Sequence, residues 1–236
     1  MAKKLNDDFS WDSYTEQHYE REMFDILQEK LNLDMIVTDF TEKDGEITFN
    51  DKLHENWMEL YHQVHKLGVK SVFECGCGCA HHLININKIT PEVTINGCDY
   101  AQTQIDLGYK YYELEKYDFA NRLTVKDLTS SEGIKEMGKH EFVYTQAVTM
   151  HLAYDKAKKF LINMRDLSSK YVFLIENINA HDYEELINDV FYDFERIHDG
   201  RYLTTGILLK RREGESKPKT GVPHFMDSIG TNNGWL

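Results

Sequence analysis

Residues 71–83 read SVFECGCGCAHHL, and this stretch decides between two interpretations of the chain. An apolar run ends at Glu74, and Gly76 and Gly78 follow it at alternate positions. Glycines in such a turn let the backbone approach a ligand, because they carry no Cβ, so the pattern predicts a cofactor-binding turn after a buried strand. The three cysteines and two histidines of the same stretch instead suggest the start of a metal site.

The spacing of the cysteines argues against the metal site. A structural zinc site normally uses Cys-x₂₋₄-Cys pairs, with a second pair elsewhere. Cys75, Cys77 and Cys79 are separated by one residue each, and Cys98 is the only other cysteine in the sequence. If Cys75 still lies in the strand, three alternate side chains running through a tight turn cannot easily converge. Small, easily buried residues suit a crowded turn, so we interpret the stretch as a cofactor cradle.

Strand-like and helix-like segments alternate from Lys70 onward. Strands are expected over residues 69–75, 93–99, 121–127, 141–148 and 170–177, and helices over 79–89, 101–117, 154–167 and 181–188. Repeated strand–helix units predict an α/β fold with a mostly parallel sheet and helices on both faces. Two strand-like runs flank Asp199-Gly200 with no room for a helix, so they should form an antiparallel hairpin at the C-terminal end of the core.

The front of the chain is expected to form a helical elaboration of this core. Apolar spacing predicts a helix over residues 11–31, and MIVTDF and EITFN on either side of Asp44-Gly45 predict a hairpin. Asp51 is placed to cap a further helix that ends near Gly68. We therefore expect an N-terminal elaboration over residues 1–69, a core over 70–211, and a C-terminal tail or lid over 212–236.

Composition and charge restrict the classes of partner. The chain has 236 residues, with 27 Lys+Arg against 40 Asp+Glu and a net charge of −13. A broad nucleic-acid or membrane surface would need a basic patch, so we expect neither partner. The first residues lack the apolar segment of a secretory signal, and no run approaches about 18 apolar residues. The clustered cysteines cannot form a spread disulfide framework, so we expect a cytoplasmic protein. Because the acidic chain lacks a basic face for RNA or DNA, we expect it to act on a small molecule.

Four motifs in order resemble those of the class I S-adenosylmethionine-dependent methyltransferases. FECGCGCA is similar to their Glu-x-Gly-x-Gly-x-Gly/Ala motif, GCDYA and KDLT to the acidic ends of their second and third strands, and YTQAVTMHL to their fourth-strand motif. The resemblance covers roughly residues 70–211 and implies a methyltransferase with a Rossmann-like seven-stranded sheet. A dinucleotide fingerprint would need a glycine where His81 stands, which disfavours NAD.

The resemblance also implies where S-adenosylmethionine binds. Asp99 would accept hydrogen bonds from both ribose hydroxyls, and Asp127 would receive the adenine amino group. Tyr14 would close on the methionine portion, although helix packing explains it equally well. His81 and His82 open the first core helix, where binding the methionine carboxylate and exposure to solvent are both compatible with the sequence. The expected cofactor-binding residues are Glu74, Gly76, Cys77, Gly78, Asp99, Tyr100, Asp127, Leu128, Gln146 and Tyr14.

Methyl transfer from a sulfonium needs an aligned acceptor and often a base. His151 follows the fourth strand, where the acceptor of the family meets the methyl group, and histidine titrates near neutrality. The alternative role for His151 is to hold the loop. Glu176 and His181 follow the fifth strand, so we expect His151, His181 and Glu176 to be catalytic. These groups also suit a divalent cation, but no tight cluster is present and no metal is predicted.

The acceptor is the least determined part of the interpretation. YTQAVTMHL and FLIENINAHDY resemble methyltransferases of bacterial surface-polysaccharide (capsule) pathways, which implies O-methylation of a sugar or sugar phosphate. An amine, phosphoramidate or protein acceptor stays open, as does a non-catalytic protein that binds S-adenosylmethionine. Phe225 and Trp235 in the tail are compatible with a lid or with a homodimer contact.

Overall fold

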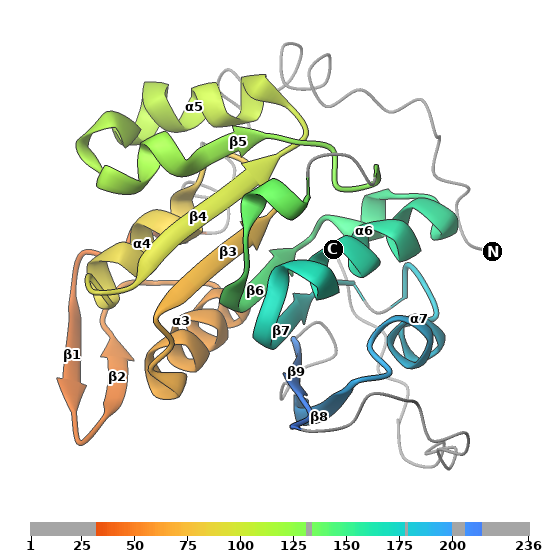
Figure 1. Cartoon of the computed structure of the whole chain (residues 1–236). Coiled ribbons are helices and arrows are strands. Elements are labelled where there is room, and N and C mark those ends of the chain that lie inside the picture. The colour runs from red at the N-terminus through yellow and green to blue at the C-terminus, as the bar shows by residue number, and fades with distance from the viewer. Residues whose placement is uncertain (1–31, 131–133, 178, 200–205, 214–236) are drawn as a thin grey trace.

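A seven-stranded sheet forms the centre of the computed structural model, which describes residues 32–130, 134–177, 179–199 and 206–213 (Figure 1). The strands are β3 (Ser71–Cys75), β4 (Thr94–Asp99), β5 (Leu123–Val125), β6 (His140–Gln146), β7 (Ser168–Ile175), β8 (Phe194–Asp199) and β9 (Ile207–Arg211). Their order is β5-β4-β3-β6-β7-β9-β8. Neighbours from β5 to β7 are parallel, whereas β9 is antiparallel to both β7 and β8. The predicted mostly parallel sheet with a closing antiparallel hairpin is confirmed.

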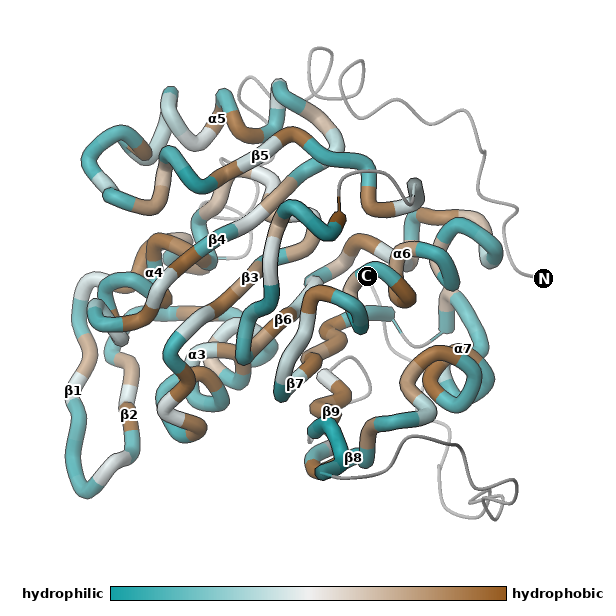
Figure 2. Tube along the Cα trace, viewed as in Figure 1, coloured by the Kyte–Doolittle hydropathy of each residue, from teal (hydrophilic) through white to brown (hydrophobic). Residues whose placement is uncertain are grey.

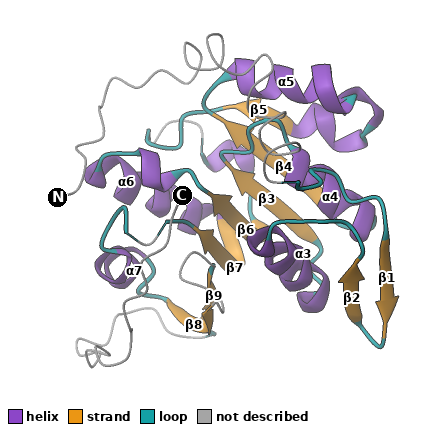
Figure 3. Ribbon diagram, turned by 180° about the vertical axis from the view of Figure 1, so that it is seen from behind, coloured by secondary structure: helices purple, strands orange, loops and turns teal. Residues whose placement is uncertain are grey.

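Helices cover both faces of this sheet (Figures 1 and 3). One face carries α3 (Glu55–Leu67), α4 (His81–Ile89) and α5 (Gln102–Tyr112), and the other carries α6 (Tyr154–Leu167) and α7 (Tyr183–Val190). Short 3₁₀ helices, η2 to η5, span Leu114–Lys116, Asp118–Arg122, Lys135–Met137 and Thr149–His151. None of the helices in the described ranges is long and apolar enough to cross a bilayer.

Burial on both faces explains why the central strands are continuous apolar runs (Figure 2). All residues of β7 after Lys170 are buried, and β6 is buried from Phe142 to Thr145. The helix predicted over 154–167 matches α6, whose side chains at Phe160, Leu161 and neighbouring helical positions lie in the core. The helix predicted over 101–117 ends earlier, at Tyr112, because Glu113 adopts a left-handed φ of 51°.

The front of the described chain forms the predicted hairpin. β1 (Phe40–Lys43) and β2 (Glu46–Phe49) pair in antiparallel register, and Asp44 and Gly45 form the turn with φ values of 55° and 79°. Residues 35–39 were expected to be part of the first strand, but their backbone bonds to a side chain instead. The Val37 N–H donates to Asn85 Oδ1 at 2.9 Å, so this segment is fixed to α4 rather than to a strand.

The expectation that Asp51 caps the next helix is wrong. Its carboxylate accepts hydrogen bonds from the backbone N–H groups of Thr38 and Asp39, at 2.7 and 2.9 Å. The cap of α3 is His54, whose Nδ1 accepts from the Asn56 N–H at 3.2 Å. The helix predicted over residues 11–31, including Tyr14, lies outside the described residues.

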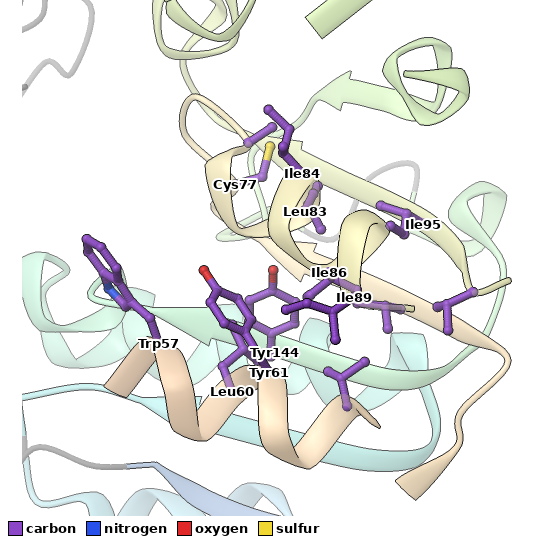
Figure 4. Packing of buried hydrophobic residues seen from close by; sticks show 14 of the residues in the cluster. Trp57, Leu60, Tyr61, Cys77, Leu83, Ile84, Ile86, Ile89, Ile95 and Tyr144 are labelled. Atoms are coloured by element: carbon purple, nitrogen blue, oxygen red, sulfur yellow. The ribbon is translucent and has the colours of Figure 1, made fainter. Parts of the chain in front are cut away.

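Helix α3 packs its apolar side against α4 and the sheet. Trp57, Leu60, Tyr61 and Val64 are buried, as their helical spacing predicts, and Gly68 ends the helix in a left-handed conformation. Figure 4 shows this cluster, in which Leu60 and Tyr61 face Ile86 and Ile89 of α4 and Tyr144 of β6. The described part of the front segment, from residue 35 onward, and the sheet therefore share one apolar core.

The strand order reverses between β3 and β6. The chain leaves β3 through α4 toward β4 on one side, and it returns to the other side when it enters β6. Loops that follow neighbouring strands diverge at such a point, and the crevice between them is where open α/β sheets bind ligands. The residues that follow β3 and β6 therefore border the candidate site.

Helix α5 approaches the turn after β3 so closely that it needs a glycine. A Cβ on Gly108 would lie 2.6 Å from the Cys79 carbonyl oxygen. Alanine normally stabilises a helix interior relative to glycine, but here its methyl group would meet backbone. We predict that Gly108→Ala lowers the free energy of unfolding by about 1–3 kcal/mol in urea denaturation. Lys110→Ala, on the exposed side of α5, should change it by less than about 0.5 kcal/mol. A more stable Gly108→Ala variant would contradict this packing.

Candidate functional site

The turn after β3 is hydrogen-bonded to the end of β4. The backbone N–H groups of Gly76 and Cys77 both donate to the Cys98 carbonyl at 2.8 Å. Gly76 has a φ of +78°, and a Cβ there would lie 2.4 Å from Val148 Cγ2. Gly78 also has a positive φ, of +50°. The backbone conformation and the close approach to the β6 loop explain why this turn alternates with glycine.

Asp99, the last residue of β4, holds the same turn from the other side. Its Oδ2 accepts from the Gly78 N–H at 2.8 Å, and its Oδ1 accepts from the Ala101 N–H at 2.9 Å. A carboxylate has about four acceptor positions, so a single Asp side chain is able to accept from several donors at once. Tyr100, next in the chain, is 56% exposed and borders the same edge.

Glu74 lies beneath the turn and is almost completely buried. It pairs in register with Tyr144 of β6, so both side chains lie on the α3–α4 face. Burial raises the pKa of the Glu74 carboxyl well above its ordinary value, and the Asp99 charge raises it further, whereas the Tyr144 hydroxyl opposes the shift. Glu74 Oε2 has no hydrogen-bond partner among the described residues. A buried carboxyl of this kind favours its protonated form.

Asp127 and Leu128 follow β5, and much of their bonding stabilises their own loop. Asp127 Oδ1 accepts from the backbone N–H and the hydroxyl of Thr129, at 2.8 and 2.7 Å. The Leu128 side chain is buried in the core on the α6 side, and its carbonyl accepts from Asn163 Nδ2 at 2.8 Å. The loop is thereby attached to α6, with Asp127 at the carboxyl end of β5.

The cysteines of the turn point to different faces of the sheet. Cys75 and Cys98 lie in the core on the α6 side, whereas Cys77 lies in the core on the α4 side. In the described ranges, no group of three or more His, Cys, Asp or Glu side chains is placed to hold a metal ion. Cys79 Sγ lies 3.5 Å from His81 Nδ1, but burial raises the pKa of this thiol to about 12 and lowers that of the imidazole to about 4. The pair is therefore neutral, without a thiolate nucleophile.

Known structures share this arrangement of strands. No protein-family model and no curated protein matches the sequence. Magnesium protoporphyrin IX methyltransferase from Synechocystis PCC 6803, solved with bound SAM, matches with a TM-score of 0.55 and 14% identity over 88% of this chain and 100% of its own. An O-methyltransferase family protein from Burkholderia thailandensis matches with a TM-score of 0.52 and 16% identity, over 66% of this chain and 56% of its own. The methyltransferase domain of bacterial CtHen1 matches with a TM-score of 0.51 and 13% identity, over 66% of this chain and 97% of its own.

The chain has the class I methyltransferase fold.

At the carboxyl end of β7, a buried carboxylate holds the loop that follows β6. Glu176 comes directly after β7, and its Oε1 accepts from the N–H groups of Val148 and Thr149 at 3.1 and 3.2 Å. Its Oε2 accepts from the Met150 N–H at 3.2 Å. Burial raises the pKa of this carboxyl, while the three N–H groups oppose the shift. The loop therefore depends on Glu176 for its shape.

The same loop carries His151, one of the residues expected to act in catalysis. His151 is half-buried in η5, and burial lowers the pKa of its imidazole, so the ring is neutral at pH 7. His181 Nε2 lies 2.8 Å from the Thr149 carbonyl oxygen. A carbonyl only accepts, so this nitrogen carries a proton and donates it. Glu176 and His181 thus both hold the loop that carries His151, and both bond to the backbone of Thr149. No sequence motif indicates this role of Thr149.

The buried state of Glu74 predicts a pH dependence of stability. A folded-state pKa above the unfolded value of about 4.3 means that the folded protein keeps a proton that the unfolded chain has lost. The resulting stabilisation is complete below pH 4.3 and is lost as the pH rises through the folded pKa. Over that window, the unfolding free energy of the wild type should fall relative to Glu74→Gln by about 1.4 kcal/mol per pH unit.

Urea denaturation of the ligand-free protein from pH 4.5 to 8 measures this difference. The exposed Glu136 provides the control, because Glu136→Gln should follow the pH dependence of the wild type. Parallel curves for Glu74→Gln and the wild type would show that the Glu74 carboxyl is ionised in the folded protein.

Proposed function

We propose that the chain is an S-adenosylmethionine-dependent methyltransferase that methylates a small polar acceptor. The observation that carries this proposal is the glycine turn at the switch point, with the carboxylate of Asp99 bonded to its Gly78 N–H. The turn admits a ligand along its backbone, and the neighbouring carboxylate suits a ribose. Further support comes from the Synechocystis methyltransferase, which was solved both with SAM and with SAH.

Five described residues would hold the cofactor in this proposal. Gly76 and Gly78 would give its methionine portion space along the turn, and Asp99 would accept from its ribose hydroxyls. Asp127 would face the adenine from the end of β5, and Gln146 would border the methionine portion from the end of β6. When bound, the cofactor supplies a methyl group on a cationic sulfonium, which suits a chain with a net charge of −13.

The chain itself would position the acceptor and take its proton. The imidazole of His151 is neutral at pH 7, so it is able to accept the proton of an acceptor hydroxyl as that oxygen is methylated. Glu176 and His181 would act as positioning residues, because they bond to the backbone of the loop rather than facing a reacting atom. A fixed loop keeps the base aligned with the acceptor.

For the acceptor, we propose the hydroxyl of a sugar or sugar phosphate, as in bacterial surface-polysaccharide synthesis. The support for this choice is the resemblance of YTQAVTMHL and FLIENINAHDY, together with the His, Glu and Asn side chains that these segments contain. An acceptor screen should therefore begin with nucleotide sugars and sugar phosphates. If only amines are methylated in this screen, the acceptor is an amine and not a sugar hydroxyl. Absence of turnover with any acceptor, despite cofactor binding, would favour a binding protein.

Cofactor binding is tested by thermal unfolding with S-adenosylhomocysteine. A ligand at about 100 times its dissociation constant adds about 2.7 kcal/mol to the free energy of unfolding. For a chain of this size, we expect the midpoint to rise by about 5–10 °C. Asp99→Ala should abolish the ligand-induced rise, because it removes the carboxylate that faces the ribose. Asp106→Ala, at an exposed position of α5, should retain it. No rise in the wild type would overturn the proposed cofactor.

The role of His151 is tested by turnover. We predict that His151→Ala lowers kcat by about 10²–10⁴-fold, because general-base catalysis contributes that much, and leaves the affinity for S-adenosylhomocysteine unchanged. In the wild type, kcat/KM should rise with pH through a pKa below the ordinary histidine value, since burial lowers it. The control is His65→Ala, which removes an imidazole of α3 that lies 3.6 Å from Glu42 of β1, and this variant should turn over normally. Equal kcat values for both variants would exclude His151 as the base.

A further inference from the structure

We propose that Asn85 and Tyr61 lock His82 in the tautomer that carries its proton on Nε2, so that His82 holds the amide oxygen of Gln146 and Gln146 presents only N–H donors to the ligand. The inference rests on the proposed function only for the identity of that ligand. It assigns positioning roles to three buried polar residues that the proposed mechanism does not use.

The first step is the orientation of the Asn85 amide. The Val37 N–H lies 2.9 Å from Asn85 Oδ1, and a backbone N–H only donates. The opposite end of the amide, Nδ2, lies 3.0 Å from the Met35 carbonyl oxygen, which only accepts. Both contacts require the same orientation, so Nδ2 is a donor. Its second contact is the Tyr61 hydroxyl at 2.7 Å, and the Tyr61 oxygen must therefore accept a hydrogen bond from Asn85.

The second step carries this polarity to His82. The Tyr61 hydroxyl lies 2.9 Å from His82 Nδ1. Because the Tyr61 oxygen already accepts from Asn85, its own proton is directed to Nδ1, which must then be unprotonated. Burial lowers the pKa of His82 well below the ordinary value, so the ring is neutral and its single proton is on Nε2. Figure 4 shows the Tyr61 phenol reaching from α3 toward α4, which carries both His82 and Asn85.

The third step concerns the free edge of the His82 ring. The Nε2 atom is buried and has no hydrogen bond within the described part of the chain. Gln146, the last residue of β6, lies beside this ring, and its side chain raises the pKa of His82, as a hydrogen-bond acceptor does. Gln146 shares the α3–α4 face with Phe142 and Tyr144, because alternate residues of a strand lie on one face. A buried N–H donor without an acceptor is unfavourable, and the amide oxygen of Gln146 is able to accept from it.

The consequence is a site that selects for oxygen. When Gln146 Oε1 accepts a hydrogen bond from His82, the Nε2 group of Gln146 faces the ligand and offers two N–H donors. The ligand atom opposite must then be an acceptor, such as a carboxylate or hydroxyl oxygen, and not an ammonium group. Gln146→Glu has the same shape but presents an acceptor at this point, so it should weaken S-adenosylhomocysteine binding by at least about tenfold.

The tautomer is measured directly by NMR of ligand-free protein labelled with ¹⁵N-histidine. We expect His82 to show a protonated Nε2 and an unprotonated Nδ1, unchanged between pH 6 and 8. In Tyr61→Phe, this preference should be lost, whereas Tyr117→Phe, which removes a hydroxyl elsewhere at the edge of the same core, should retain it. A wild-type His82 with its proton on Nδ1 overturns the proposal without recourse to any variant.

The link to the ligand is measured by a double-mutant cycle. In the otherwise wild-type protein, Tyr61→Phe should weaken S-adenosylhomocysteine binding by about five- to tenfold. In a Gln146→Ala background the same change should weaken it by less than twofold, because Tyr61 affects the ligand only through the Gln146 amide. Full additivity, or normal binding by Gln146→Glu, overturns the proposal. Repeating the cycle with 5′-methylthioadenosine, which keeps the ribose but lacks the carboxylate, shows which ligand oxygen Gln146 binds. Coupling that persists points to a ribose hydroxyl, and coupling that disappears points to the carboxylate. If the wild type does not bind the nucleoside at all, the proposed function fails while the tautomer measurement stands.

Discussion

The packing of two loops against each other is the constraint on which the site depends. The turn after β3 passes so close to Val148 that Gly76 has no room for a side chain. This contact joins the loop that follows β3 to the loop that follows β6. Asp99 then fixes the turn from β4, so three parallel strands contribute to one rigid edge. The rest of the site is arranged around that edge.

Buried polar groups determine the remaining geometry. Glu176 satisfies three consecutive backbone N–H groups of the His151 loop, and His181 satisfies a carbonyl of the same loop. On the α3–α4 face of the sheet, Asn85 and Tyr61 set the polarity at His82. In both places, side chains far from the expected chemistry orient the groups nearest to it. Such arrangements are rigid because a buried group that loses its partner is costly.

The sequence predicted the architecture well and the polar contacts poorly. Continuous apolar runs and the alternating glycines after Glu74 indicated the sheet and the tight turn after β3, because backbone requirements leave a local pattern. Asp51 was misassigned because its partners, Thr38 and Asp39, are reached only when the chain folds back across the hairpin. For the same reason, the hydrogen bonds of Glu176 to the loop after β6 were not predicted, since nothing near it in the chain reveals the N–H groups that it binds. Hydrogen bonds between residues far apart in the chain leave no regular spacing in the sequence from which they could be predicted.

The attachment of the His151 loop to Glu176 also determines when the site forms during folding. The Met150 N–H and the carboxylate that receives it are 26 residues apart, separated by all of α6 and β7. The loop therefore cannot take its final shape until α6 has crossed the sheet and β7 has paired with β6. Bringing Met150 and Glu176 together closes a 26-residue stretch of chain, which costs conformational entropy before the contact forms. Residues of this loop consequently belong to the late-forming part of the molecule, and a folding nucleus built on β3, β6 and their helices would precede a competent site.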